Sequence, residues 1–392
     1  MDRFVNPYRP GAGTPPPALI GRDDLIEGFE FALRRALDRR PGKSCMTVGL
    51  RGVGKTVLLN RFVVIAAELG MRVGFLEVPE SSSFRGLLSI RLRKILLELQ
   101  SRPVRDAVSR LITRALSVLR SFTLQLPDGT SLSLGVEPLP GYADSGELSE
   151  DLTDVMVAVG EAASACETGL VLAVDEVQYL SETELAAVVA AIHRTTQLSL
   201  PIVLVGAGLP QLPRLVGEAK SYSERLFEFP VVDSLVASDA AEAIVRPARD
   251  KGVEFETAAI DLIVEESRGY PYFLQEWGSH VWNGSPASPI SGGDVRSVRA
   301  GVIAALDNNF FRVRLDRLTP KESEYLRAMA ELGPGPHRSG DIAAQLGVKS
   351  ESVAPRRANL ISKGMIYSPA HGDTAFTVPL FDDFLRRSMP ES

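Results

Sequence analysis

Residues 49–56 read Gly-Leu-Arg-Gly-Val-Gly-Lys-Thr, the complete pattern G-x-x-x-x-G-K-[ST] of a phosphate-binding loop. In such a loop, backbone N–H groups and the positive end of the following helix converge on nucleotide phosphates. Lys55 stands where an ammonium reaches the β- and γ-phosphates, and Thr56 stands where a hydroxyl ligates Mg²⁺. The pattern therefore predicts a site for a nucleoside triphosphate and Mg²⁺. Its residues are Gly49, Leu50, Arg51, Gly52, Val53, Gly54, Lys55 and Thr56.

A second motif supplies the groups that hydrolysis needs. An apolar run, 169–174, ends in Asp175 and Glu176. In a parallel sheet the carboxyl end of such a strand lies beside the phosphate loop. Asp175 is then placed to hold Mg²⁺, and Glu176 to orient or deprotonate the attacking water. A strand ending in two carboxylates is common, so the prediction of a Mg²⁺-dependent ATPase rests on its combination with Lys55 and the phosphate loop.

Strands and helices alternate around these two motifs. Apolar runs at 45–49, 71–78, 169–174, 201–207 and 226–232 predict buried strands, and the segments between most of them have helical periodicity. A helix beginning at the end of the phosphate loop stops at Gly70. This order predicts an α/β fold built on a doubly wound parallel sheet.

Residues 80–150 are expected to be an insertion in this core. The pattern over 83–122 is helical with a break at Pro103, and 122–136 predicts a β-hairpin around Asp128-Gly129. The helical part carries nine basic residues against two acidic ones. Two interpretations remain open: a helix docked on the sheet with a solvated basic face, or a second contact with DNA.

Several short motifs together resemble the AAA+-type P-loop ATPases. Besides the two motifs above, the resemblance rests on Leu19-Ile20-Gly21-Arg22, Asp-Glu-x-Gln at 175–178 and Gly269-Tyr270-Pro271. It covers residues 19–285 and is strongest to the branch shared by origin-recognition-type initiators and STAND signalling ATPases. It implies ATP as the nucleotide. It also implies an adenine pocket formed by Ile20, Gly21, Arg22 and Pro271.

The resemblance also implies a polar sensor side chain at the end of one strand and an arginine finger. At the strand end after Val205 this chain has Gly206-Ala207-Gly208 instead of a polar residue. Arg225 occupies the position of a finger that reaches the γ-phosphate of a neighbouring subunit, which implies a homo-oligomer on ATP binding. The alternatives are an ordinary surface arginine at 225, or a role in cis for one of Arg246, Arg249 and Arg268.

The chain divides into four expected segments. Residues 1–18 form an extended arm, 19–235 the ATPase core, 236–315 a helical lid and 316–392 a winged helix-turn-helix. The winged helix-turn-helix is predicted because the last segment contains three helices followed by a hairpin. Its third helix contains the expected DNA-binding residues Arg356, Arg357, Asn359 and Lys363. Residues 319–392 hold nine basic and nine acidic side chains, so contact with protein instead of DNA is the alternative.

Composition limits the remaining choices. The net charge of −6 over 392 residues gives no overall attraction to nucleic acid or anionic membrane. No window reaches the roughly 18–20 apolar residues of a membrane span, and Cys45 and Cys166 lack metal-ligand spacing. We therefore expect a cytoplasmic protein with no membrane partner. The expected function is an ATP-dependent switch that binds double-stranded DNA. The alternatives are a STAND-like signalling or defence regulator and a helper ATPase of a mobile element.

Overall fold

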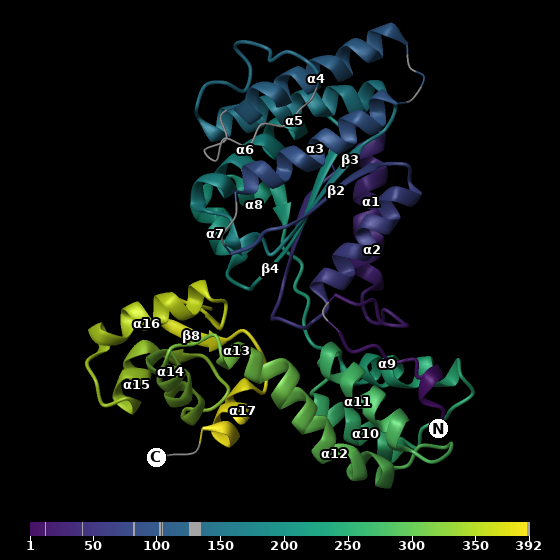
Figure 1. The fold of residues 1–392 in the computed structure, drawn as a ribbon, viewed down its shortest axis with the longest axis vertical. Helices are drawn as coiled ribbons and strands as arrows, with labels where there is room; N and C mark the ends of the chain where they lie inside the picture. The colour runs from purple at the N-terminus through teal and green to yellow at the C-terminus, as the bar shows by residue number, and fades with distance from the viewer. Residues whose placement is uncertain are drawn as a thin grey trace.

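The computed structural model describes residues 1–11, 13–40, 42–80, 83–101, 103, 105–124 and 135–389. An α/β core, a helical lid and a C-terminal unit follow one another along the chain (Figure 1). The core sheet has five parallel strands in the order β2-β3-β4-β1-β5. The strands are β1 (Ser44–Val48), β2 (Arg72–Glu77), β3 (Leu170–Asp175), β4 (Ile202–Gly208) and β5 (Phe227–Glu228). This sheet confirms the predicted α/β fold class.

Helices cover both faces of the sheet, as the apolar strands require. On β3, Val171 and Ala173 pack into the cluster that contains helices α1 and α2, whereas Leu172 and Val174 pack into the cluster of helices α3 to α6. One face is covered by α1 (Asp23–Leu37) and α2 (Lys55–Glu68). The other is covered by α3 (Phe84–Gln100), α4 (Asp106–Leu124), α5 (Leu148–Ala165), α6 (Glu182–Gln197), α7 (Leu212–Ala219) and α8 (Ser223–Leu226).

Two predicted β segments differ from the structure. The strand expected over 226–232 is reduced to β5 plus a single bridge between Val231 and Val48. Pro230 interrupts it, because proline has no N–H to donate to the neighbouring strand. The hairpin expected over 122–136 was predicted to begin at residue 122, but residues 122–124 are the end of helix α4. Its remainder, 125–134, lies outside the described residues.

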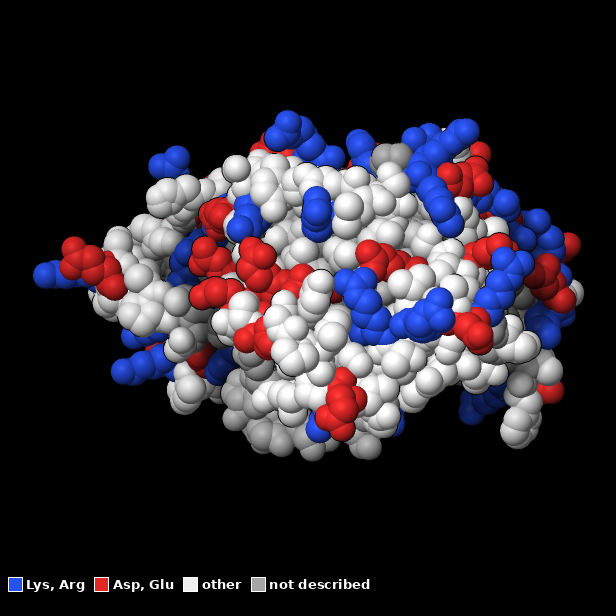
Figure 2. All heavy atoms as spheres, turned by 90° about the horizontal axis from the view of Figure 1, so that it is seen from above, with Lys and Arg blue, Asp and Glu red and all other residues white. Residues whose placement is uncertain are grey.

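The basic segment of the insertion is a docked pair of helices. Most of the large apolar residues of α3 and α4 are buried, although Ile90 and Leu124 are exposed, and several of the basic side chains have acidic partners. Arg85 lies 3.6 Å from Asp151 and over the ring of Phe122, and Arg114 lies 2.7 Å from Glu161. Figure 2, which views the molecule from the α4 end, shows side chains of both signs interspersed. Arg102 lies outside the described residues.

The lid is a helical layer on which the N-terminal arm docks. Tyr8 of the arm is 4% exposed and donates to the backbone oxygen of Ile244, 2.5 Å away. The expected arm therefore packs against the lid and includes one turn of 3₁₀ helix at 3–5. The lid comprises α9 (Ala237–Arg249), α10 (Thr257–Ser267), α11 (Pro271–Gly284) and α12 (Gly292–Leu306). A π-helical turn, η3 (Asp307–Arg312), and a short α13 (Val313–Leu315) lead out of it.

The C-terminal unit has the element order of a winged helix-turn-helix. Its helices are α14 (Pro320–Glu331), α15 (Ser339–Gln345), α16 (Ser350–Ser362) and α17 (Phe381–Ser388). Its antiparallel sheet has the order β6-β8-β7, from β6 (His337–Arg338), β7 (Ile366–Tyr367) and β8 (Asp373–Phe376). Strand β6 and helix α17 were not predicted from the sequence.

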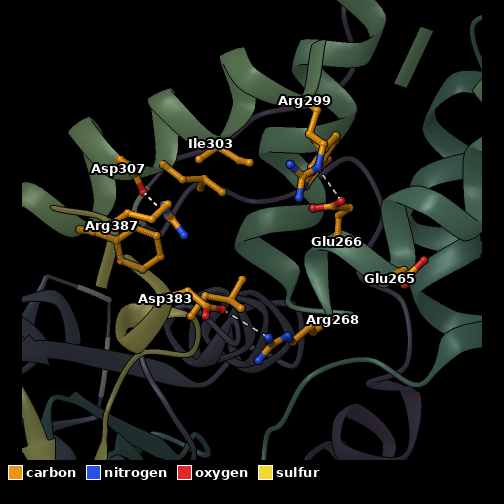
Figure 3. Close-up of a pocket in the computed structure, with 12 residues that line it drawn as sticks. Glu265, Glu266, Arg268, Arg299, Ile303, Asp307, Asp383 and Arg387 are labelled. Atoms are coloured by element: carbon orange, nitrogen blue, oxygen red, sulfur yellow. Dashed lines mark hydrogen bonds and ion pairs between the residues drawn. The ribbon is translucent and has the colours of Figure 1, made fainter. Parts of the chain in front are cut away.

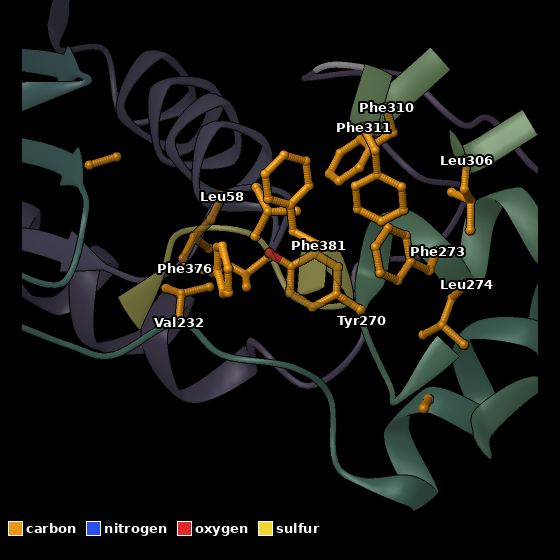
Figure 4. Close-up of a cluster of buried hydrophobic side chains, with 14 of the residues drawn as sticks. Leu58, Val232, Tyr270, Phe273, Leu274, Leu306, Phe310, Phe311, Phe376 and Phe381 are labelled. Atoms are coloured by element: carbon orange, nitrogen blue, oxygen red, sulfur yellow. The ribbon is translucent and has the colours of Figure 1, made fainter. Parts of the chain in front are cut away.

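One apolar cluster joins the three parts of the molecule. Phe273 of the lid packs edge-on against Phe310 of η3, and Phe311 stacks on Phe384 of α17. The cluster continues to Leu58 of helix α2 (Figure 4). The C-terminal unit is therefore packed against the lid through aromatic side chains. In the described ranges, no helix has the length and apolar composition needed to span a membrane.

Candidate nucleotide-binding site

Glycines shape the loop between β1 and α2. Gly52 and Gly54 have φ angles of +88° and +93°, which favour glycine. A side chain at Gly49 would meet the backbone oxygen of Val232 at 2.0 Å. Gly54 caps α2, so the first N–H groups of that helix face the loop. The loop thus has the strand–loop–helix context that phosphate binding requires.

Lys55 lies at the centre of this loop. Its side chain is buried, and Nζ donates to the backbone oxygens of Gly49 and Leu50 at 2.9 and 2.7 Å. Burial lowers the pKa of Lys55 to about 8. A buried ammonium surrounded by oxygen acceptors is suited to hold phosphate oxygens in place of those carbonyls. The residues present therefore fit a nucleotide polyphosphate.

The two expected Mg²⁺ ligands are brought together. The Thr56 hydroxyl donates to Oδ2 of Asp175 at 2.6 Å, so strand β3 and the start of α2 meet at this point. Burial raises the pKa of Asp175. A hydroxyl and a carboxylate side by side are the oxygen ligands that Mg²⁺ prefers, usually together with phosphates and water. Glu176 follows directly, with its N–H bound to Oδ1 of Asp175 at 2.9 Å.

The residues expected around adenine converge on the segment 233–239. A side chain at Gly21 would meet Asp239 at 2.4 Å, and the N–H of Leu235 donates to the backbone oxygen of Gly269 at 2.9 Å. Arg22 hydrogen-bonds the backbone oxygen of Asp233. The Ile20–Arg22 segment and the Gly269–Pro271 turn therefore lie against the same stretch of chain.

The candidate arginine finger is separated from its own phosphate loop. Arg225 is exposed on α8, just before β5, and Phe227 pairs with Ser44 at the start of β1. The phosphate loop follows the other end of β1, about 15 Å away along the strand. Of the alternative arginines, Arg268 pairs with Asp383 of α17 at 3.4 Å. Arg249 pairs with Glu242 of its own helix at 3.4 Å, and Arg246 is exposed.

The C-terminal unit touches the phosphate loop directly, which the sequence did not indicate. The N–H of Arg51 donates to the backbone oxygen of Thr377 at 2.9 Å, and its Nη2 donates to the Tyr179 hydroxyl at 2.6 Å. Gly364, two residues after the end of α16, lies so close that an added Cβ would be 2.4 Å from Nη2 of Arg51. We call the contact formed by Arg51, Tyr179, Gly364 and Thr377 the loop seam.

Further polar contacts flank the loop seam. Arg317, which precedes α14, lies 3.2 Å from Glu80, and Tyr179 also donates to Glu80 at 3.3 Å. On the lid side, the Tyr270 hydroxyl binds the backbone oxygen of Arg51. Arg314 lies 4.1 Å over the ring of Phe310, and burial lowers its pKa to about 10, with the charge of Arg51 acting in the same direction. No local sequence signal links these residues to the phosphate loop.

Two of the four expected DNA-binding residues are bonded within the C-terminal unit, and the other two are exposed or partly exposed. Arg357 donates to Thr374 and Ser368 at 2.8 Å each, which ties α16 to the small sheet. Lys363 pairs with Glu322 at 2.8 Å. Asn359 is exposed and Arg356 is partly exposed on α16.

A cavity of about 340 Å³ lies elsewhere, between the lid and helix α17 (Figure 3). Its lining includes Trp277 and Phe311. Three ion pairs stand at its sides: Arg268 with Asp383, Arg299 with Glu266, and Arg387 with Asp307. Two of these pairs connect the lid and η3 to α17, so they hold the C-terminal unit in place.

Comparison with known families defines the class of the core. Residues 18–205 match the model described as an AAA ATPase domain, and this part of the chain is therefore an AAA ATPase domain. The expected resemblance to AAA+-type ATPases is confirmed by this match. Residues 308–385 match a model described only as a domain of unknown function. No curated protein matches the chain.

Solved structures are similar to this chain, and the first of them, with a TM-score above 0.5, shares its fold. The Walker-type ATPase PABY2304 of Pyrococcus abyssi is 17% identical, with 97% of this chain and 99% of that chain covered and a TM-score of 0.60. The Aeropyrum pernix ORC1 protein in complex with DNA is 16% identical over 98% and 96% of the two chains, with a TM-score of 0.46. The Thermotoga maritima RuvB Holliday junction branch migration motor is 18% identical over 91% and 92%, with a TM-score of 0.43.

Proposed function

We propose that this protein is an ATP- and Mg²⁺-dependent ATPase whose nucleotide controls the position of its C-terminal unit, and that this unit binds double-stranded DNA. The observation that carries the proposal is the hydrogen bond from Arg51 in the phosphate loop to Thr377 in the C-terminal unit. A nucleotide that reshapes the loop must act on this bond.

In this proposal the site residues have the following roles. The loop N–H groups and Lys55 hold the phosphates, and Thr56 and Asp175 hold Mg²⁺. Bound Mg²⁺ neutralises developing charge on the phosphate oxygens. Glu176 orients the attacking water and accepts its proton. Adenine lies among Ile20, Gly21, Arg22 and Pro271.

The contacts of Lys55 support coupling between the nucleotide and the loop seam. ATP binding requires the ammonium to exchange the carbonyls of Gly49 and Leu50 for phosphate oxygens. These carbonyls belong to the two residues before Arg51, which carries the contact to the C-terminal unit. Rearrangement of this short loop therefore weakens the loop seam. Because coupling is reciprocal, the docked unit opposes ATP binding to the same extent.

Docking also limits access to α16. Gly364, at the end of this helix, is pressed against Arg51. The C-terminal end of α16 therefore faces the ATPase core, whereas Arg356 and Asn359 lie further back along the helix. Release of the unit would open the whole helix to a major groove, where arginine contacts phosphates and asparagine can read adenine. Arg357 and Lys363 then act by holding α16 in place.

A protein partner is the second candidate for the C-terminal unit. The internal bonds of Arg357 and Lys363 favour it, because they engage two of the four side chains of the proposed DNA surface. In either case Arg225 is proposed to act between subunits of a homo-oligomer. Its exposure and its distance from its own phosphate loop support a role toward a neighbour.

Phosphate release from ATP tests the enzymatic part of the proposal. The full chain should hydrolyse ATP, and Glu176→Gln should bind ATP while losing at least tenfold in turnover. A Glu176→Gln variant that turns over at the parental rate would show that another residue positions the water.

DNA binding is tested with the full chain and duplex DNA at several salt concentrations, with and without a non-hydrolysable ATP analogue. The analogue should strengthen binding, and Arg356→Ala should weaken it. The matched control is Lys321→Ala, which removes an exposed charge from α14. Absence of binding at low salt in both nucleotide states would refute the DNA function and leave a protein partner.

A further inference from the structure

Gln178 makes a bridge that the site described above does not use. It lies in η2 (Val177–Tyr179), directly after the two carboxylates of strand β3. Its Nε2 donates to Oε2 of Glu176, and its Oε1 accepts from the N–H of Leu209 at 3.1 Å. One side-chain amide thus joins the Glu176 carboxylate to the residue that follows β4.

The end of β4 is shaped to accept this amide. An added Cβ at Gly208 would lie 2.9 Å from Oε1 of Gln178 and 2.8 Å from Leu212, and one at Gly206 would lie 3.1 Å from Val177 and from Met46. These contacts are tighter than ordinary packing. The absence of a side chain at Gly208 therefore leaves room for the amide of Gln178.

Glu176 needs an external group to fix its carboxylate. Its backbone has a φ of +54°, an uncommon value for a residue other than glycine, and a glutamate side chain has several rotatable bonds. The positive charge of Lys55 lies within electrostatic range of it. A carboxylate that turned toward this ammonium would be held there and would not be directed at water. The bond from Gln178 opposes that movement.

We propose that Gln178 is a positioning residue for ATP hydrolysis. It holds the Glu176 carboxylate through its amide nitrogen and is itself held by the N–H of Leu209 at the end of β4. This inference rests on the proposed function, because it concerns the step in which Glu176 orients the attacking water. Gln178 itself does not touch the nucleotide in this proposal.

The first test separates turnover from binding in the full chain with Mg²⁺. Gln178→Leu keeps a similar volume and removes both hydrogen bonds. It should lower kcat by about 10- to 100-fold, part of what a general base contributes, while the Kd for ATP stays within about twofold. The matched control is Gln211→Leu, since Gln211 is also buried but its side-chain carbonyl accepts no hydrogen bond from the described residues. That control should keep the parental kcat.

A second variant reaches the same bridge from the other side. Gly208→Ala places a methyl group 2.9 Å from Oε1 of Gln178 and 2.8 Å from the end of the Leu212 side chain, and it does not alter the Glu176 side chain itself. It should also lower kcat without weakening ATP binding. If Gln178→Leu does not fold, the kcat of Gly208→Ala tests whether the bridge made by Gln178 supports turnover. In the Glu176→Gln background, Gln178→Leu should cause no further loss of turnover, because it acts through Glu176.

Three results would overturn the proposal. They are a parental kcat in both bridge variants, a loss of ATP affinity as large as the loss of kcat, or additive losses in the Glu176→Gln background. Failure of the proposed function has a different signature. If the parental protein itself does not hydrolyse ATP, the enzymatic function is refuted and the role of Gln178 with it.

Discussion

Gly364→Ala should detach the C-terminal unit from the phosphate loop and thereby strengthen ATP binding. Gly364 has a φ of +62°, and its added methyl group would be 2.4 Å from Nη2 of Arg51 and 2.9 Å from the Tyr179 hydroxyl. Either the guanidinium moves or the unit moves away from the loop. Both movements loosen the loop seam.

The size of the effect follows from two contributions. Alanine in the left-handed region costs about 1–2 kcal/mol, whatever surrounds it. Loosening the backbone hydrogen bond from Arg51 to Thr377, which joins the loop to the unit, removes a further contribution of about 0.5–1.5 kcal/mol. If docking opposes ATP binding, this second contribution appears as affinity. Since about 1.4 kcal/mol is a factor of ten, the affinity for ATP should rise by roughly two- to tenfold.

Gly347→Ala is the matched control for backbone strain. Gly347 has a φ of +67° in the same unit, and no described heavy atom lies within 4 Å of its added Cβ. Titration calorimetry with a non-hydrolysable ATP analogue compares the two variants with the parental chain. Gly347→Ala should bind ATP as the parent does. Equal affinities for both variants, or weaker binding by Gly364→Ala, would refute the coupling between loop and unit.

Three further predictions concern the loop, the unit and the arm. Lys55→Ala should weaken ATP binding at least a hundredfold by calorimetry, since the buried ammonium is lost; unchanged affinity would overturn the phosphate-loop assignment. Burial raises the pKa of Glu322, but hydrogen bonds led by that of Lys363 outweigh it and lower the pKa below the ordinary 4.5. The stabilisation is therefore present above pH 4.5 and disappears as the pH falls through the lowered pKa. Melting curves against pH should show this acid loss, with a flatter profile in Glu322→Gln. Tyr8→Ala should cost about 3–5 kcal/mol in urea unfolding, whereas Phe4→Ala, at a fully exposed position, should cost almost nothing; equal costs would show that the arm does not stabilise the lid.

The core was predictable because its signals are local. The loop motif, the buried strands and the glycine stop at Gly70 each occupy a few consecutive residues, and a parallel sheet leaves few ways to connect them. Helix α17 could also have been found, since Phe381, Phe384 and Leu385 have helical spacing. The short β5 could have been anticipated from Pro230.

The contacts around the loop were not predictable in the same way. Arg51 and Tyr179 are 128 residues apart, and Tyr270 is 219 residues from the loop residue it binds. No periodicity or motif in the sequence predicts such long-range contacts, because they depend on how the lid and the C-terminal unit pack. The bridge made by Gln178 is an intermediate case. Its residue was visible in Asp-Glu-x-Gln, but its partner Leu209 became apparent only when β3 and β4 were placed side by side.

The number of basic residues in helix α16 does not by itself show how many of them are free to bind DNA, because tertiary structure engages some of them. As a sequence, its basic side chains indicate a surface for nucleic acid. In the fold, Arg357 hydrogen-bonds Thr374 of the small sheet, and Lys363 forms an ion pair with Glu322 at the start of α14. The C-terminal end of α16 lies against the phosphate loop. A basic residue that stabilises its own domain contributes less to DNA affinity than an exposed one, because its hydrogen bonds would first have to be broken. The case for DNA therefore depends on Arg356, Asn359 and the release of the unit, and the same release would also expose α16 to a protein partner.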